Sequence, residues 1–269
     1  MMDQFFVLFQ RLVPHHGLSR LVGFLANSRI GWLKNLCIST FIRIYKVDMQ
    51  EAARKDPADF ANFNDFFTRE LQPGTRSING SITCPADGTV SAVGRIERNQ
   101  IFQAKGLTYS LEKLLANQQV KHFVDGSFIT IYLAPNNYHR VHFPVDGDLL
   151  SATYIPGKLF SVNQVTAENI PDLFAANERL VCYMETEAGS VAIIMVGAMI
   201  VAGIKPVWND EPYMPQNLKP EIFEIPQHYD KGDELGQFRL GSTAIILLPG
   251  MVTWKVKAGA VVKFGDALV

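Results

Sequence analysis

Residues 240–248 read LGSTAIILL, and this segment gives the clearest indication of the fold. A polar break at Gly241-Ser242 precedes a continuous apolar run over 243–248, which has the length and the β-branched content of a buried strand. Beyond Pro73 the chain consists of similar short runs, which Gly, Pro, Asn and Asp interrupt. We therefore predict strands at 89–93, 128–133, 191–196, 199–204, 243–248 and 252–256.

Apolar residues at helical spacing are concentrated in the first 72 residues. Two helices with a break near 27–31 are predicted, and a third begins at the cap and first-turn proline Asp56-Pro57 and ends at Pro73-Gly74. The apolar positions that define them are Leu18, Leu21, Val22 and Leu25, then Ile30, Leu33, Cys37, Phe41 and Ile44, then Phe60, Phe63, Phe67 and Leu71. Further along, only 111–117 and 170–176 have a helical pattern.

These patterns predict an α+β fold, in which N-terminal amphipathic helices at 1–55 precede a mainly antiparallel, β-rich domain at 56–269. A chain of 269 residues with 48% hydrophobic residues can bury a sizeable core. The formal net charge of −1 and the lack of a basic, aromatic patch argue against nucleic-acid binding. Three widely spaced cysteines, Cys37, Cys84 and Cys182, favour a reducing compartment over a disulfide framework.

Charge is distributed unevenly along the chain. Residues 1–48 contain six Lys and Arg against two Asp, a net charge of +4, and are also rich in Phe, Leu, Ile and Trp. Such a segment suits helices that lie in a membrane interface beside anionic headgroups. An ordinary amphipathic helix pair packed on its own core has the same composition, so the segment alone leaves both interpretations open. No secretory signal or uninterrupted spanning run is present in the sequence.

Three short segments could carry chemistry: PADG at 85–88, YHRVH at 138–142 and LGST at 240–243. They could supply a carboxylate, an imidazole and a hydroxyl, the groups that activate a serine nucleophile, although such residues also occur together by chance. His139 and His142 could instead bind zinc, but no further ligand stands at a characteristic spacing, so we predict no metal site. Gly241-Ser242 permits attack of the hydroxyl on the preceding carbonyl, or is simply a turn before a strand.

Taken together, the motifs resemble those of the bacterial, pyruvoyl-dependent phosphatidylserine decarboxylase proenzymes. The resemblance rests on FNDFFTREL at 63–71 with Pro73-Gly74 and Arg76, on the three segments above, on PGKLFSVN at 156–163 and on VGA at 196–198. These motifs occur in the family's order over roughly residues 60–260. Their number and order make the resemblance far more specific than any one of them.

The resemblance implies a reaction and a role for each site residue. Asp87, His142 and Ser242 would form a triad for cleavage between Gly241 and Ser242, giving a beta chain of 1–241 and an alpha chain of 242–269. Ser242 would become a covalent pyruvoyl cofactor that forms a Schiff base with phosphatidylserine, and His139 would serve in the decarboxylation to phosphatidylethanolamine and CO₂. A dimer of processed protomers, held peripherally on the cytoplasmic side of a bacterial inner membrane, is also implied.

Two other functions compete with this interpretation. A serine hydrolase would use Asp87, His142 and Ser242 on an external ester or amide without cutting its own chain. A noncatalytic membrane-binding module of the lipoyl-like kind would use the turns at Gly232-Asp233 and Gly265-Asp266 and would need neither histidine. Self-cleavage at residue 242 separates both rivals from the decarboxylase.

Overall fold

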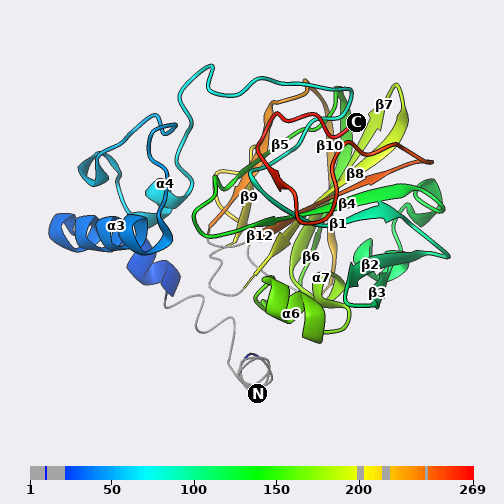
Figure 1. The fold of residues 1–269 in the computed structure, drawn as a ribbon, viewed down its shortest axis with the longest axis horizontal. Helices are drawn as coiled ribbons and strands as arrows, with labels where there is room; N and C mark the ends of the chain where they lie inside the picture. Colours follow the sequence, from blue (N-terminus) through cyan, green and yellow to red (C-terminus); the bar gives the residue numbers. More distant parts are fainter. Residues whose placement is uncertain (1–9, 11–21, 199–202, 214–218, 240–241) are drawn as a thin grey trace.

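The structure is a computed structural model that describes residue 10 and residues 22–198, 203–213, 219–239 and 242–269 (Figure 1). Predicted positions at 11–21, including Leu18 and Leu21, and the residue Gly241 therefore lie outside the described residues. The helical elements are α3 (Gly31–Tyr45), η1 (Pro57–Asp59), α4 (Phe63–Phe67), α5 (Leu111–Leu114), η2 (Val120–His122), α6 (Gln164–Asn169) and α7 (Leu173–Ala176). The strands are β1 (Gly88–Arg95), β2 (Gln100–Ala104), β3 (Leu107–Ser110), β4 (Ser127–Leu133), β5 (Arg140–His142), β6 (Gly147–Ile155), β7 (Arg179–Thr186), β8 (Gly189–Gly197), β9 (Ile204–Pro206), β10 (Glu221–Tyr229), β11 (Glu234–Phe238), β12 (Ser242–Leu248) and β13 (Val261–Val262).

An antiparallel sheet of eight strands, in the order β10-β6-β7-β8-β12-β4-β1-β13, forms the centre of the described chain. The segment 243–248 lies in β12, which pairs with β8 on one side and β4 on the other, and every residue of β12 is buried. A strand that is buried on both faces has no polar side to alternate with, which explains its continuous apolar run. The predicted α+β class with a mainly antiparallel sheet is confirmed.

The two faces of this sheet are covered differently. One face packs against the small sheet β5-β11-β9, through Val141, Leu235, Phe238 and Ile204. The other face packs against the hairpin β2-β3 and helices α5, α6 and α7, through residues such as Tyr109 and Phe174. Because side chains alternate along a strand, each residue of β12 faces one of these two cores. Ser242 is two positions before Ala244, so both side chains face the core on the β5-β11-β9 side.

Most predicted strands of the body are confirmed. Strands β1, β4, β8 and β12 contain the predicted 89–93, 128–133, 191–196 and 243–248. Of the predicted 199–204, residues 199–202 lie outside the described residues, and β9 begins at Ile204. The predicted helices at 111–117 and 170–176 are shorter, as α5 and α7.

The predicted strand at 252–256 is wrong. Val252, Trp254 and Val256 do pack inward against the core, so the alternation that suggested a strand is real. The backbone, however, makes only scattered bonds, such as Val252 N–H to Ser127 Oγ and Lys255 N–H to the Leu268 carbonyl. Burial of alternate side chains needs an extended chain but does not need a ladder of hydrogen bonds.

A small helical unit precedes the β-rich body. Residues 22–26 are helical, a break follows at 27–30, and α3 then runs to Tyr45, so the predicted break is confirmed. The third predicted helix is wrong as a single element. Asp56 caps the 3₁₀ turn η1 through the Ala58 N–H, and Asn62 then caps a separate five-residue helix, α4, through the Asp65 N–H. In a continuous helix, the Asp65 N–H would donate to a backbone carbonyl of the preceding turn. Here it donates to the Asn62 side chain, so a new helix begins at this point.

Helices α3 and α4 share a core that spans the predicted boundary between residues 55 and 56. Ile38 and Val47 pack with Phe60 and Phe66, and the ring of Phe41 meets that of Phe66 edge to face at 6.0 Å. Helix α4 also contacts the body, where the Phe67 ring lies 4.0 Å from the His139 ring. The helical unit is therefore tied to the site residues of the body, as the neighbouring positions of α4 and the β-body in Figure 1 suggest.

Candidate active site

Ser242 is the first residue of the central strand β12. It stands opposite Gly197 of β8 and Leu133 of β4 and is fully buried. Its Oγ has no hydrogen-bond partner among the described residues. Buried hydroxyls normally have partners, and an orphaned one in a well-packed core indicates a reactive or strained site.

His139 lies in the loop before β5 and is also fully buried. Its Nδ1 is 2.9 Å from the Asn137 carbonyl oxygen, which can only accept, so Nδ1 carries the proton and Nε2 is the free acceptor of the neutral ring. In the described residues Nε2 has no partner. Burial lowers the pKa of His139 to about 3, and the cationic Arg69 adds to this effect, so the imidazole is neutral near pH 7.

His142, at the end of β5, is held in the same tautomer. Its Nδ1 donates to the Gly232 carbonyl at 2.8 Å, which leaves Nε2 as the acceptor, 3.0 Å from the Tyr138 hydroxyl. Its ring stacks on that of Phe264, with centroids 3.6 Å apart. Burial lowers the pKa of His142 to about 4, so this imidazole is also neutral at pH 7 and can accept a proton.

Asp87 lies just before β1, and its carboxylate has two partners. Oδ1 accepts from the Phe264 N–H at 2.8 Å, and Oδ2 pairs with Arg76 at 2.9 Å. Burial raises the pKa of Asp87, while the Phe264 amide and the Arg76 guanidinium oppose the rise. Arg76 also pairs bidentately with Glu51, at 2.6 and 2.7 Å, and so links Asp87 to the helical unit.

The structure brings Asp87 and His142 together around Phe264, which binds one through its amide and the other through its ring. The two side chains share no hydrogen bond with each other among those the described residues form. Ser242 stands four positions after Phe238, whose N–H donates to the His139 carbonyl. The side chain of Ser242 faces the interior between the large and the small sheet, and its partner in β4, Leu133, precedes the loop that carries His139, but no hydrogen bond of the described residues joins Ser242 to either histidine.

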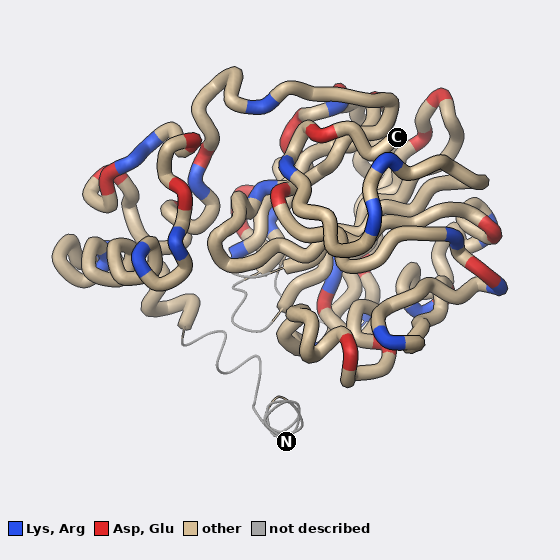
Figure 2. Tube along the Cα trace, viewed as in Figure 1, with Lys and Arg blue, Asp and Glu red and all other residues tan. Residues whose placement is uncertain are grey.

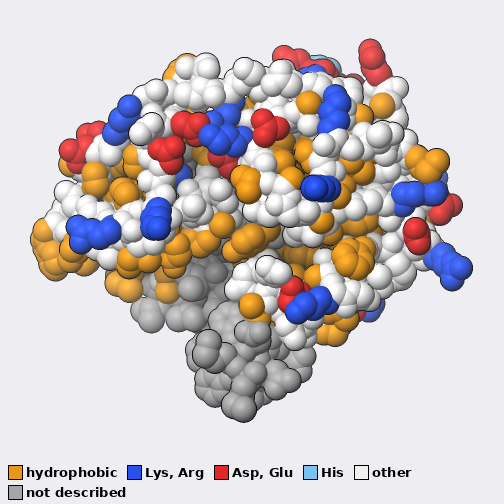
Figure 3. All heavy atoms as spheres, viewed as in Figure 1, with side chains coloured by type: hydrophobic (Ala, Val, Ile, Leu, Met, Phe, Trp, Pro, Cys, Tyr) orange, Lys and Arg blue, Asp and Glu red, His pale blue; other side chains and the backbone are white. Residues whose placement is uncertain are grey.

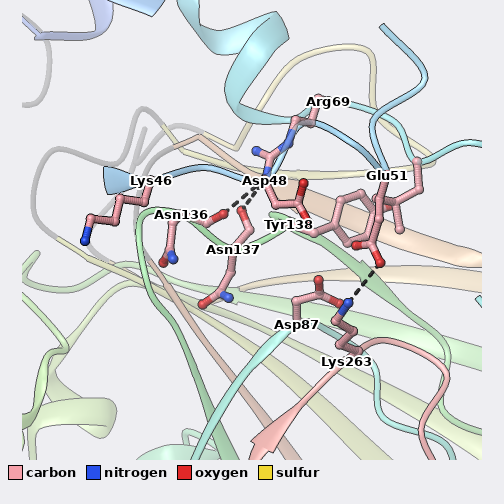
Figure 4. Close-up of a pocket in the computed structure, with 10 residues that line it drawn as sticks. Lys46, Asp48, Glu51, Arg69, Asp87, Asn136, Asn137, Tyr138 and Lys263 are labelled. Carbon is pink, nitrogen blue, oxygen red and sulfur yellow. Dashed lines mark hydrogen bonds and ion pairs between the residues drawn. The ribbon is translucent and has the colours of Figure 1, made fainter. Parts of the chain in front are cut away.

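A cavity of about 150 Å³ opens beside this interior, between the helical unit and the body (Figure 4). Asp87, Asn137 and Tyr138 line it together with Arg69 and Lys46. Arg69 is 4% exposed, and its Nη2 donates to the carbonyls of Asn136 and Asn137, the second of which also accepts from His139. The cavity therefore reaches the loop that orients His139.

Sequence reasoning assigned no role to two of these groups. Tyr138 was part of the YHRVH segment, but its hydroxyl becomes relevant only when folding places it on His142. Gly232 contributes a carbonyl, which carries no side-chain signal at all. The nearest indication was the Gly232-Asp233 turn. The Asp233 carbonyl accepts a hydrogen bond from the N–H of Phe143, the residue after His142.

An Asp, two neutral histidines and a serine whose Oγ has no partner among the described residues, all buried in an α+β fold, are the groups of an enzyme rather than of a binding module. The sequence model described as phosphatidylserine decarboxylase matches residues 63–269, and a second one, described as PSD, matches residues 5–46. The chain belongs to the phosphatidylserine decarboxylase family.

Similar proteins span the whole chain. The phosphatidylserine decarboxylase proenzyme of Ectopseudomonas mendocina is 47% identical over 281 aligned residues, covering 100% of this chain and 98% of that protein. The proenzyme of the same name from Saccharophagus degradans is 46% identical, with 100% and 98% coverage. That from Pseudomonas aeruginosa is 48% identical, with 99% and 96% coverage.

Proposed function

We propose that the chain is the precursor of a phosphatidylserine decarboxylase that cleaves itself between Gly241 and Ser242. The observation that carries the proposal is the fully buried Ser242 Oγ, which has no hydrogen-bond partner in the described residues and begins the central strand. A serine hydrolase would need this hydroxyl open to an external substrate in the uncut chain, where it is 0% exposed, whereas self-cleavage needs no external substrate. The similar proteins are named proenzymes, which also favours self-processing over the hydrolase.

Self-cleavage would begin with transfer of the Ser242 hydroxyl proton to a base. His142 suits this role because its neutral Nε2 is an acceptor, and the Tyr138 hydroxyl now bound there would give way to Ser242. Attack of Oγ on the Gly241 carbonyl would form an ester as the Gly241–Ser242 C–N bond breaks, and His142 would pass the hydroxyl proton to the released nitrogen of residue 242. Asp87 would stabilise the protonated His142 from its position beside Phe264.

The residues around Ser242 fit the pyruvoyl group that would replace it. Gly197, directly opposite, has no side chain, so no Cβ of β8 stands beside position 242, and the side chains of Leu159 and Glu178 lie nearest to that point. A pyruvoyl carbonyl supplies an electrophile for the substrate amine and an electron sink for loss of CO₂. His139, with its Nε2 unpartnered in the described residues, would hold or donate the proton that replaces the lost carboxyl group.

We also propose that the N-terminal helices hold the enzyme on a membrane, on the cytoplasmic side. Trp32, Leu36 and Ile44 of α3 are 71%, 59% and 66% exposed, and Figure 3 shows hydrophobic side chains along the edge that α3 forms. Figure 2 shows Lys and Arg but no acidic residue on α3. Within the described residues, no helix is long and apolar enough to cross a membrane. An apolar helix face flanked by cations suits an interfacial position, and a dimer of processed protomers would present two such faces.

Denaturing mass spectrometry of the purified full chain tests the proposed cleavage. Self-processing predicts a C-terminal fragment of residues 242–269 that begins with a pyruvoyl group, together with a fragment of residues 1–241. The variant Ser242→Ala should remain one chain of 269 residues. A wild-type chain that stays intact after native incubation would overturn the proposal.

A further inference from the structure

Glu178 is a buried carboxyl that the mechanism above does not use. It stands one residue before β7 and is 3% exposed. The Gly197 N–H donates to its carbonyl at 2.8 Å, which continues the register Arg179↔Val196 of β7 and β8 by one residue. Gly197 in turn is the partner of Ser242 in β12, so Glu178, Gly197 and Ser242 form a row across three adjacent strands, β7, β8 and β12 in Figure 1.

The three residues also face the same side of the sheet. Leu180, Met195 and Ala244, each two positions along from a member of the row, all belong to the core under β5-β11-β9. Because strand side chains alternate, the side chains of Glu178 and Ser242 project into that core as well. Between them stands Gly197, which contributes no side chain.

The Glu178 carboxyl leans over this gap. Its Oε1 lies 3.8 Å from the position that a Cβ would take on Gly197. Neighbouring antiparallel strands are about 5 Å apart, so the backbones of residues 178 and 242 are separated by roughly 10 Å. The Glu178 side chain covers part of that separation, so its carboxyl lies near Gly197, the residue between 178 and 242 in the row. The Leu159 Cδ2 lies in the same gap, 3.6 Å from that Cβ position.

The carboxyl is also chemically suited to exchange protons. Among the described residues it has no ion pair, and the Tyr154 hydroxyl, beside it, is its one polar side-chain neighbour with an effect on its charge. Burial raises the pKa of Glu178 to about 7, against a smaller lowering by Tyr154. With a pKa near neutral pH, a large share of the carboxyl is ionised and can accept a proton, and the carboxylate is a stronger base than an ordinary glutamate.

We propose that Glu178 is the base that removes the α-proton of Ser242 after the ester has formed; the inference rests on the proposed function. The Cα–H bond electrons of residue 242 would form a Cα=Cβ double bond while the Cβ–Oγ bond breaks. The proton passes to the Glu178 carboxylate, and the Gly241 carboxylate leaves with the bonding pair. The product is dehydroalanine at position 242, whose hydrolysis releases ammonia and gives the pyruvoyl group.

The other site residues are already engaged at this step. His142 has returned the hydroxyl proton to the nitrogen of residue 242 that the broken C–N bond released, and its Nδ1 is bound to the Gly232 carbonyl, while Asp87 is bound by Arg76 and by the Phe264 amide. His139 donates through Nδ1 to the Asn137 carbonyl and stands just before β5, a strand of the small sheet rather than of the large one. Glu178 stands in the same row of the sheet as Ser242, one residue before a strand that carries none of them.

The full-length variant Glu178→Gln tests this role, because glutamine resembles the protonated acid in shape but cannot accept the proton. We expect the ester to form and to accumulate, with pyruvoyl formation slowed by at least about a hundredfold. Hydroxylamine should then cut the ester and release residues 242–269 with an N-terminal serine, whereas the wild type releases the pyruvoyl form. Glu178→Asp should restore part of the rate, and the exposed Glu185→Gln at the other end of β7 should process like the wild type.

Each result decides for or against Glu178. Wild-type pyruvoyl formation in Glu178→Gln overturns the proposal. So does a folded Glu178→Gln chain that neither processes nor yields to hydroxylamine, because the glutamate would then act before the ester exists. The variant Gly197→Ala supplies a second measurement: its methyl meets only ordinary contacts, from 3.4 Å, yet stands between residues 178 and 242, and we expect it to accumulate the same ester. A wild-type chain that is never cleaved would instead contradict the proposed function.

Discussion

Both site histidines have their tautomer fixed by a backbone carbonyl rather than by a carboxylate. His139 donates to Asn137 and His142 to Gly232, and each therefore offers Nε2 as an acceptor. Burial lowers the pKa of His139 to about 3 in the intact chain, well below working pH. A histidine in this state is a base, so its later use as an acid requires that cleavage changes its surroundings.

The neutral histidines make stability depend on pH. Their folded pKa values, about 3 and 4, lie below the unfolded value of about 6.5, so below pH 6.5 the unfolded chain takes up protons that the folded chain does not. Stability from this source is complete above pH 6.5 and is lost as the pH falls, by about 2 kcal/mol per histidine at pH 5. We expect urea denaturation of Ser242→Ala to show this loss, and the added change His139→Gln to reduce it by about that amount. If the free energy of unfolding fell equally between pH 7 and 5 with and without His139→Gln, the burial of a neutral His139 would be contradicted.

Arg76 positions Asp87 and favours its ionised form. Its guanidinium opposes the burial that raises the pKa of Asp87, so Arg76→Gln should raise that pKa further and leave less carboxylate at pH 7. We expect self-cleavage at pH 7 to slow by at least about tenfold on a denaturing gel, and the loss to shrink as the pH rises to 9. Arg54→Gln, which breaks the partly exposed pair with Asp65, is the matched control and should cleave normally. A uniform loss at every pH would indicate misfolding instead of a role through Asp87.

At the scale of elements, side-chain patterns predicted which segments are extended but not which ones pair. The alternation at 252–256 is real, yet no ladder forms there, whereas the continuous run 243–248 occupies the centre of the large sheet. The phenylalanines of 60–67 lie on one core, yet Asn62 divides the expected helix. Both errors arise because burial constrains side chains, while backbone hydrogen bonds depend on neighbours that are distant in sequence.

The exposed face of α3 gives a prediction for this element. Trp32 and Leu36 lie one turn apart and are mostly exposed, so replacing both by Glu should cost the fold little. Each large apolar side chain that enters the interface contributes roughly 1.5–3 kcal/mol, so we expect the fraction bound to anionic phospholipid vesicles to fall by more than tenfold in cosedimentation. Met251→Glu, at an equally exposed apolar position of the body, should bind like the wild type. If the wild type, the double variant of Trp32 and Leu36, and Met251→Glu all bound the vesicles equally, the proposal that this face of α3 binds a membrane would be contradicted.

At the scale of the whole molecule, the sequence indicated the site segments and the fold class but not how distant segments meet. Phe264 connects Asp87 with His142 although it lies more than a hundred residues from either, and no local pattern marks it. Glu178 carried a signal that could have been used. In an extended chain, Glu178 lies on the same side as the apolar Leu180, Cys182 and Met184. The alternation therefore places a charged residue in a row of side chains that faces inward.

The same topology predicts what happens to the chain after the cut. Strand β12 pairs with β4 over its whole length and with β8 over 242–247, and β13 pairs with β1, so residues 242–269 are bound within the sheet on several sides. Burial of Ile245, Ile246, Leu247 and Leu248 alone contributes roughly 6–12 kcal/mol. We therefore expect the two fragments of the processed protein to coelute on size exclusion in native buffer and to separate only in denaturant. Loss of the small fragment in native buffer would mean that the peptide bond before Ser242, and not the sheet, holds β12 in place.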